Sequence, residues 1–330
     1  MNFIKFCNIG EPDRIGLRNV EKDPDYGSRA GFRFLLYCNI SGVKHAGSYK
    51  KAKMNIKIDE KKIADLKNWF QHYVAKYKRM DPDARQNIML KIEHTARVCK
   101  NSLDIGKALG LSDHELRLAE IIALFHDIGR FEQYARYQTF LDMKSEDHAR
   151  LGVTVLKENG VLKGFDSETK GLILRTIQYH NRAALPDHET GTGLFFAKLI
   201  RDADKLDIWR VVTEYYHQKN RRKNSTIELG LTDTPGFSAD VYQDLMNEKI
   251  VDISHIQNLN DFKLLQLGWV FDINFTLTYR LLKSKGYVEL IGDALPKSDK
   301  IENILNAIHL FLDHRCRENG DAADGVILDS

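Results

Sequence analysis

The chain has 330 residues, 43% of them hydrophobic, which is enough for a large core, and its length suggests about two domains. Its 49 basic and 46 acidic side chains give a formal net charge of +3. A balance this close to neutral indicates neither a stable nucleic-acid complex nor a membrane surface. No stretch approaches the roughly 20 apolar residues that a membrane span needs.

The cysteines and the beginning of the chain indicate the compartment. Cys7, Cys38, Cys99 and Cys316 are scattered singly, so neither a zinc ribbon nor a disulfide framework is indicated. Lys5 interrupts an apolar stretch that is already too short for a signal peptide. We therefore expect a cytoplasmic protein.

Residues 1–56 differ from the rest of the chain. They are rich in Gly, Arg and Asp and show little helical periodicity, although residues 32–38 are compatible with a short strand. Two interpretations remain open. The segment is either a loosely ordered N-terminal extension, or translation begins at Met54.

From Asp59 onward the periodicity is helical. Asp81 followed by Pro82 is a helix start, and that helix should end at Gly110. Ser112 and Glu115 form a capping box, which opens a helix that ends near His126.

The same patterns predict further helices along the chain. We expect one capped by Ser145, one over 167–180, one from Gly193 past Asp204, one long periodic segment over 261–285 and one over 299–316, with a polar loop at 217–226. The sequence therefore predicts an all-α protein in three parts. These are an irregular N-terminal extension (1–56), a helical core (57–215) and a C-terminal helical region packed on that core (216–330).

Six imidazole and carboxylate side chains stand out in the helical core. They are His94, His126, Asp127, His148, His180 and Asp204. Divalent metals of borderline-to-hard character take such ligands. Their spread over about a hundred residues is too wide for a zinc finger but suits a site inside a helical bundle. Two metal ions would use that many ligands, and two-metal sites are suited to the hydrolysis of phosphate esters.

The order of these residues resembles the HD-domain metal-dependent phosphohydrolases. In that superfamily an upstream His is followed by an adjacent His-Asp doublet and a downstream Asp. Here these are His94, His126–Asp127 with Ile-Gly after it, and Asp204. His148 and His180 stand where dinuclear members have two further histidines. The resemblance covers roughly residues 85–212 and implies an HD-domain helical bundle with additional C-terminal helices.

The resemblance implies two divalent ions, drawn from Mn, Fe, Mg, Co, Ni or Zn. Asp127 would bridge them and would be catalytic, and the ions would lie about 3.5–4 Å apart with a bridging water activated to hydroxide. His94, His126 and Asp204 would hold one ion. His148 and His180 would complete the other.

Arg130 follows the doublet by one turn and is the candidate for binding the phosphoryl group and stabilising its charge. Lys205, Arg97 and Arg182 are further substrate-binding candidates. Cyclic-dinucleotide phosphodiesterases of the HD-GYP kind usually have Lys at the position of Arg130 and a second His where this chain has Asn181. No Gly-Tyr-Pro follows here, so a cyclic-di-GMP substrate is not expected.

Several of these assignments have an alternative explanation that involves no function. His148 could be an exposed residue in the first turn of a helix, and Arg130 could be an ion-pair partner of Glu132. Asp207 either accepts a hydrogen bond from a metal ligand or from Lys205, or lies on a solvated helix face. The aromatic residues Trp69, Phe70 and Trp209 are expected in the core rather than in a substrate platform.

The leading hypothesis is a phosphohydrolase or phosphodiesterase that acts on a small phosphorylated molecule or a nucleotide. One alternative is a di-iron oxygenase, because a few members of the same superfamily use a similar six-ligand set with dioxygen. The other is a nucleotide-binding module without turnover. The region after residue 216 has no chemical motif, and a homo-oligomer is left open.

Overall fold

The computed structural model of the protein describes residues 57–79, 81–218, 223–224 and 226–317. Within these ranges every regular element is a helix, so the predicted all-α class is confirmed. The expected extension over 1–56, with its candidate strand at 32–38 and the candidate start at Met54, lies outside the described residues.

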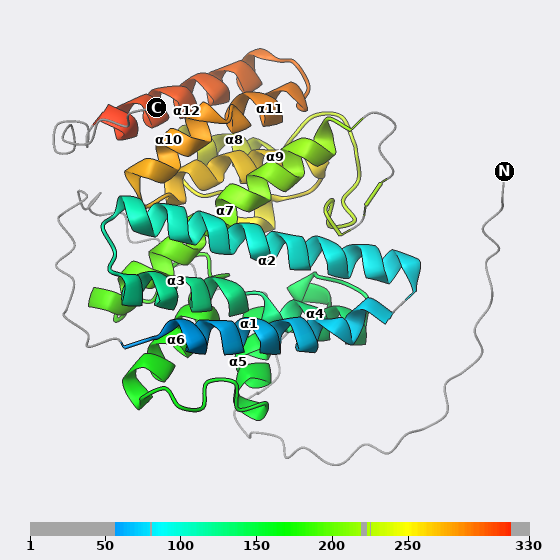
Figure 1. Cartoon of the computed structure of the whole chain (residues 1–330). Coiled ribbons are helices and arrows are strands. Elements are labelled where there is room, and N and C mark those ends of the chain that lie inside the picture. Colours follow the sequence, from blue (N-terminus) through cyan, green and yellow to red (C-terminus); the bar gives the residue numbers. More distant parts are fainter. Residues whose placement is uncertain (1–56, 80, 219–222, 225, 318–330) are drawn as a thin grey trace, which may run out of the picture. The chain divides into compact units, whose positions relative to one another are not determined.

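The first helices begin where the sequence predicts. They are α1 (Glu60–Ala75), α2 (Pro82–Ala108) and α3 (Asp113–Phe125), and Figure 1 shows them side by side. The Asp81 side chain accepts from the backbone N–H of Ala84, and Ser112 and Glu115 form the expected capping box. Gly110, with φ +66°, follows the end of α2, and glycine adopts this conformation without a Cβ penalty.

The next helices are α4 (Ile128–Tyr137), α5 (His148–Glu158), α6 (Ser167–Tyr179) and α7 (Gly191–Tyr216). The prediction that Ser145 caps α5 is wrong. The cap is Asp147, whose carboxylate accepts from the backbone N–H groups of Ala149 and Arg150. The Ser145 hydroxyl instead donates to the carbonyl of Leu141.

The C-terminal helices are α8 (Ala239–Met246), α9 (Leu259–Gly268), α10 (Thr276–Ser284), α11 (Tyr287–Asp293) and α12 (Asp299–Arg317). The expectation of one long periodic segment over 261–285 is wrong, because the 3-10 helix η4 (Trp269–Asp272) interrupts it. After η4 the backbone N–H groups of Asn274 and Phe275 donate to the carboxylate of Asp202 on α7. Donation to another helix takes these groups out of a continuous helical ladder.

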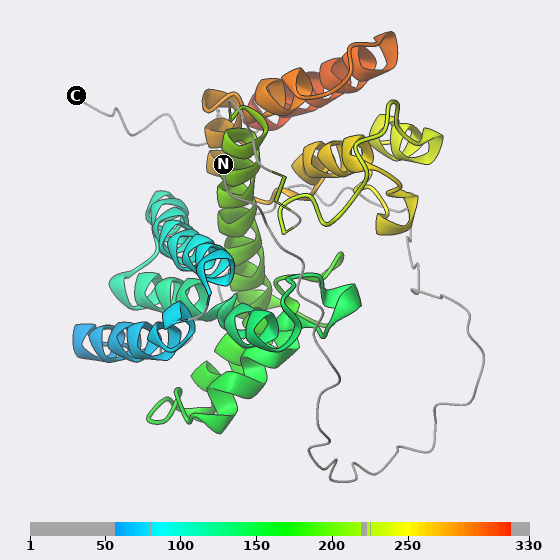
Figure 2. The same cartoon turned by 90° about the vertical axis from the view of Figure 1, so that its right-hand side faces the viewer.

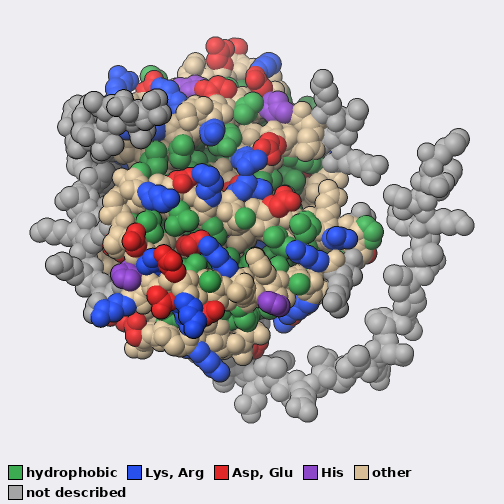
Figure 3. Space-filling model, in the orientation of Figure 1, with side chains coloured by type: hydrophobic (Ala, Val, Ile, Leu, Met, Phe, Trp, Pro, Cys, Tyr) green, Lys and Arg blue, Asp and Glu red, His purple; other side chains and the backbone are tan. Residues whose placement is uncertain are grey.

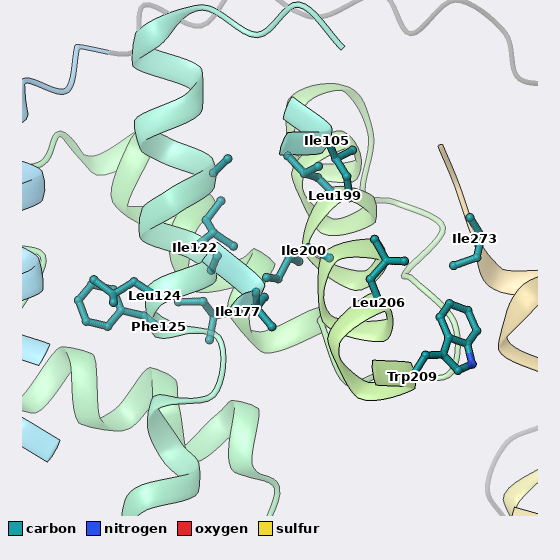
Figure 4. Packing of buried hydrophobic residues seen from close by; sticks show 14 of the residues in the cluster. Ile105, Ile122, Leu124, Phe125, Ile177, Leu199, Ile200, Leu206, Trp209 and Ile273 are labelled. Atoms are coloured by element: carbon teal, nitrogen blue, oxygen red, sulfur yellow. The ribbon is translucent and has the colours of Figure 1, made fainter. Parts of the chain in front are cut away.

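Helix α7 is the central element of the fold. It contacts α2, α3 and α6 on one side and α10 and α11 on the other, and Figure 2 shows it standing between the earlier and the later helices. Its buried residues face in several directions, as expected for a helix enclosed by others. In Figure 4 the core runs from Ile122 and Ile177 past Ile200 towards Trp209 and Ile273. Trp209 and Phe70 are buried, as predicted, whereas Trp69 is only partly buried against the core.

The surface in Figure 3 mixes acidic, basic and hydrophobic side chains, with no large patch of one sign of charge on the face shown. Among the described residues, no helix has both the length and the apolar character required to cross a membrane.

Candidate metal centre

Six successive helices, α2 to α7, each supply one of the candidate side chains. Their positions are His94 within α2, His126 at the C-cap of α3, Asp127 at the N-cap of α4, His148 at the first residue of α5, His180 at the C-cap of α6 and Asp204 within α7. All are buried except Asp204, whose side chain is 18% exposed. The interpretation of His148 as an exposed residue is therefore wrong.

One cluster gathers around His94. Its Nε2 lies 3.3 Å from Nε2 of His126 and 3.1 Å from Oδ1 of Asp204. Oδ2 of Asp127 lies 3.5 Å from the same nitrogen of His94 and 3.7 Å from Nε2 of His126. These four side chains therefore point their ligand atoms at a common space.

A second cluster gathers on the other oxygen of Asp127. Nε2 of His148 and Nε2 of His180 lie 3.1 Å apart. Oδ1 of Asp127 is 3.3 Å from the first and 3.7 Å from the second. Asp127 is thus the residue that both clusters share. Its side chain makes no cap hydrogen bond to its own helix, although it stands at the N-cap position.

The rings of His126 and His180 are oriented by the ends of their own helices. Nδ1 of His126 lies 2.7 Å from the carbonyl oxygen of Ala123, and Nδ1 of His180 lies 2.6 Å from that of Ile177. A carbonyl oxygen can only accept, so Nδ1 carries the hydrogen in both rings. The last carbonyls of a helix lack partners within it, which makes them available for this role.

The rings of His94 and His148 are oriented by carboxylates. Nδ1 of His94 lies 2.7 Å from Oδ2 of Asp207, and Nδ1 of His148 lies 2.7 Å from Oδ2 of Asp142. Carboxylates next to ligating histidines fix the tautomer and the ring orientation. In its neutral form, each of the four rings therefore presents the lone pair of Nε2 to one of the two clusters.

This donor set fits cations. Two pairs of acceptor nitrogens and two carboxylates face each other in a buried space, and the buried Oδ1 of Asp204 has no hydrogen-bond partner. Buried acceptors without a partner are costly. Imidazole nitrogen and carboxylate oxygen are ligands that divalent transition metals accept. The residues present therefore fit two cations, with four ligand atoms at one cluster and three at the other.

The surroundings of most of these groups favour the protonation state that can bind a metal ion, which is the ionised carboxylate or the neutral imidazole. Burial raises the pKa of Asp127, but the charge of Lys91 opposes burial and holds that pKa well below its ordinary value. Burial likewise opposes ionisation of Asp204, but the imidazoles of His126 and His94 hold its pKa well below the usual range. Burial lowers the pKa of His148 to about 4, so its ring is neutral at pH 7.

His94 is the exception in the metal-free protein. Burial and the charge of Lys91 lower its pKa, but the nearby carboxylates of Asp204 and Asp207 outweigh them and the pKa is raised. A cation at this cluster therefore competes with a proton on His94.

Asp142 and Asp207 are the carboxylates that contact the rings of the candidate ligands His148 and His94. Asp207 is 1% exposed, so its interpretation as part of a solvated helix face is wrong. In the sequence, its position three residues after Asp204 was the feature that indicated a role beside a ligand. Asp142 is the first residue of the 3-10 helix η2 (Asp142–Lys144) before α5, where it also accepts from Arg130 and Gln133. No pattern in the sequence pointed to Asp142, because a carboxylate six residues before a histidine has no fixed geometry relative to it.

Arg130 lies next to the two clusters, and its guanidinium already donates hydrogen bonds to neighbouring groups. Its Nη1 donates to the carbonyl of Phe140 at 2.5 Å and to Asp142 at 2.9 Å. Its Nε is buried without a hydrogen-bond partner, 3.5 Å from Oδ1 of Asp127. Glu132 pairs with Arg136 instead, so the interpretation of Arg130 as the partner of Glu132 is wrong.

The other substrate-binding candidates occupy different surroundings. Arg97 makes a two-point contact with Asp207, at 2.5 and 3.1 Å. Lys205 is buried and lies 2.5 Å from Oδ2 of Asp272. Arg182 is exposed, with its guanidinium 4.7 Å from the ring centroid of Tyr179. A role of these three in substrate binding remains a prediction.

Lys91 is a cation at the centre that the sequence reading missed. It precedes His94 by one turn of α2, and its Nζ lies 2.6 Å from Oδ2 of Asp127. The spacing of three residues along a helix was the available signal, since it places both side chains on one face.

Gly129 lets α4 and α5, which each carry a candidate ligand, approach each other closely. A Cβ at this position would lie 2.1 Å from the carbonyl oxygen of His148 and 2.5 Å from the backbone nitrogen of Gly152. Any side chain would push α4 and α5 apart. The glycine after the doublet is therefore required by the approach of Asp127 to His148.

A buried charge cluster connects the candidate ligand His180 to the C-terminal region. Arg201 donates to the backbone carbonyl of His180 at 3.3 Å and also to that of Arg182. Its guanidinium pairs with Asp272 of η4, which also receives the ammonium of Lys205. Asp272 thus holds a cation that contacts the backbone of His180.

Comparison with known families agrees with this arrangement. Residues 92–209 match the family model described as HD domain, and this stretch includes all six side chains. Comparisons with curated proteins and with solved structures returned no significant match.

Proposed function

Because residues 92–209 form an HD domain, a superfamily whose members are generally metal-dependent phosphohydrolases, we propose that this protein hydrolyses phosphate esters with two divalent ions. The observation that carries the proposal is the pair of acceptor clusters that share Asp127. Each cluster sets two Nε2 atoms against each other, at 3.3 Å in one and 3.1 Å in the other.

In this proposal His94, His126, Asp204 and one oxygen of Asp127 hold the first ion, and His148, His180 and the other oxygen hold the second. When bound, such ions lower the pKa of water and withdraw charge from a phosphoryl oxygen. The chain's own residues fix the ligand geometry. Asp207 and Asp142 keep the rings of His94 and His148 in the tautomer that leaves Nε2 free.

Positive side chains at the centre would stabilise the charge that develops on the phosphoryl group. The buried Nε of Arg130 has no hydrogen-bond partner, and the carboxylate of Asp142 and the carbonyl of Phe140 already hold the guanidinium in place. A donor that is fixed before the reaction needs no reorganisation during it. Arg130 is therefore the residue we assign to this role.

The site favours a small substrate or the end of a larger one. Asp127 is 4% exposed, whereas Lys91 and Asp204 are each 18% exposed and Arg130 is 16% exposed. The phosphoryl group must therefore enter at the edge of the site formed by Lys91, Asp204 and Arg130. We propose a phosphate ester of a small molecule or of a nucleotide.

The proposal is tested by elemental analysis and a substrate panel on the same protein preparation. We expect two ions per chain, and release of phosphate or cleavage of a diester from a panel of phosphomonoesters, phosphodiesters and nucleotides, with Mn²⁺ under argon. Asp127→Ala should lose both the metal and the turnover. Asp65→Ala, at an exposed position of α1, is the matched control and should keep both.

Two results would contradict the proposal. Oxygen consumption by an iron-loaded protein that cleaves no ester would favour the di-iron oxygenase. Binding of nucleotides without turnover under every metal condition would favour the binding module.

A further inference from the structure

Two cationic side chains bracket Asp127. Nζ of Lys91 lies 2.6 Å from Oδ2, and Nε of Arg130 lies 3.5 Å from Oδ1. Lys91 comes from α2 and Arg130 from α4, so different helices place the two charges on the two oxygens of one carboxylate.

The same aromatic ring lies beside both cations. Nζ of Lys91 is 5.6 Å from the ring centroid of Phe140, and Cζ of Arg130 is 5.9 Å from it. Phe140 itself is 8% exposed. The ring gives both cations an apolar, polarisable surface, and it limits how far either of them can move away from the centre.

The ion pair between Lys91 and Asp127 would compete with the binding of a metal ion by the same carboxylate. Oδ2 of Asp127 is also the oxygen that faces the cluster of His94 and His126. A dication at that cluster would attract the carboxylate and repel the ammonium, and charges this close interact strongly in a buried site. Lys91 would then need another anionic partner within reach of its present position.

We infer that Lys91 is a further catalytic residue, whose ammonium binds an oxygen of the phosphoryl group on the side of Asp127 opposite Arg130. The inference rests on the proposed function and adds to it a second cationic contact from the chain. A phosphoryl group has several anionic oxygens, so two separated cations can contact it at once. At 18% exposed, Lys91 reaches the edge by which such a group must enter.

The competing explanation is that Lys91 only neutralises Asp127 and keeps its carboxylate in place. The two explanations differ in what the charge acts on. Removal of a substrate contact weakens the binding of phosphate and slows turnover while the ions remain. Removal of a neutralising charge alters metal retention instead.

The test compares Lys91→Met, Lys91→Gln and Lys91→Arg with the wild type. Lys100→Met is the matched control, because Lys100 lies on the same helix but is 75% exposed and pairs with Asp104. Three measurements are made on Mn²⁺-loaded protein. These are metal content by elemental analysis, the affinity for inorganic phosphate by titration calorimetry, and kcat/KM for the best ester of the panel.

We expect both uncharged variants to keep two ions, to bind inorganic phosphate at least tenfold more weakly and to lose about a hundredfold in kcat/KM. Lys91→Arg should recover part of the loss, and Lys100→Met should behave as the wild type. Because two uncharged side chains are compared, failure of one variant to fold does not remove the test.

Wild-type affinity for inorganic phosphate in the uncharged variants would overturn the inference. Loss of the ions from these variants would overturn it too, in favour of the neutralising role. A wild type that binds phosphate but cleaves no ester would contradict the proposed function alone. A wild type that binds no inorganic phosphate would overturn the assignment of Lys91.

Discussion

The carboxylate of Asp207 lies 2.7 Å from Nδ1 of His94, and the guanidinium of Arg97 donates two hydrogen bonds to the same carboxylate. Helix α2 carries the histidine and the arginine, and α7 carries the aspartate. The contact between two helices that both bear candidate ligands is therefore also the contact that orients one ligand ring. This relationship explains why a residue outside the ligand set should control metal affinity.

Replacement of Asp207 by Asn should weaken metal binding by roughly tenfold to a hundredfold. An amide can no longer offer two acceptor oxygens to His94 and Arg97 at once, so the ring loses its fixed orientation. Competitive titration with a chromogenic chelator measures the effect, and Asp65→Asn on α1 is the control. Unchanged affinity for both ions would mean that Asp207 only links α2 to α7.

Replacement of Gly129 by Ala should destabilise the metal-free protein by about 2–3 kcal/mol, because the new methyl group would meet backbone atoms rather than flexible side chains. The matched control is Gly171→Ala on α6. There the nearest atom is the end of the Arg175 side chain, 3.2 Å away, and a helical Gly→Ala change is neutral to stabilising by ~1 kcal/mol.

Urea unfolding of both variants measures these differences. Metal content should also fall in Gly129→Ala, since α4 and α5 each carry a candidate ligand. Equal stability of the two variants would show that α4 and α5 can separate at little cost.

The metal-free protein should lose stability as the pH falls from about 6.5 to about 4. Burial lowers the pKa of His148 to about 4, whereas an unfolded histidine titrates near ~6.5. Between these values the unfolded chain binds the additional proton, so the stability that the neutral ring supports is present above this window and lost within it.

Urea unfolding at several pH values measures this effect. The contribution of one proton approaches ~1.4 kcal/mol per pH unit, or about 3 kcal/mol over the whole window. His148→Gln should flatten the profile, with His72→Gln at an exposed position of α1 as the control. Parallel profiles for wild type and His148→Gln would rule out this account.

Replacement of Asp272 by Asn should disturb the site of His180 from a distance. The change leaves the cations of Arg201 and Lys205 buried with weaker compensation, and breaking such a pair costs about 3 kcal/mol. Because Arg201 also donates to the carbonyl of His180, retention of the second ion should fall before that of the first.

Metal titration together with thermal unfolding separates these two effects. Asp293→Asn is the control, because Asp293 is 66% exposed and pairs only across one turn with Lys297. Simultaneous loss of both ions would indicate general unfolding instead of a local effect on His180.

The sequence by itself determined the features that depend on near neighbours. The capping box at Ser112 and the proline after Asp81 predicted where α3 and α2 begin, because a helix start is decided within one turn. The ordered histidines and aspartates also indicated the ligand chemistry, since residue type alone limits which cations a side chain can bind.

Only the tertiary structure decided the features that depend on residues far apart in the chain. Lys91 contacts Asp127, which lies 36 positions away in the chain. Asn274 donates to Asp202, which lies 72 positions away, and the helix expected over 261–285 is interrupted there. Asp142 became the partner of His148 because the 3-10 helix η2 (Asp142–Lys144) brings its carboxylate within 2.7 Å of Nδ1 of that ring. Local propensity is set by adjacent backbone and side-chain atoms, whereas these contacts exist only once packed helices fix the distance between their side chains.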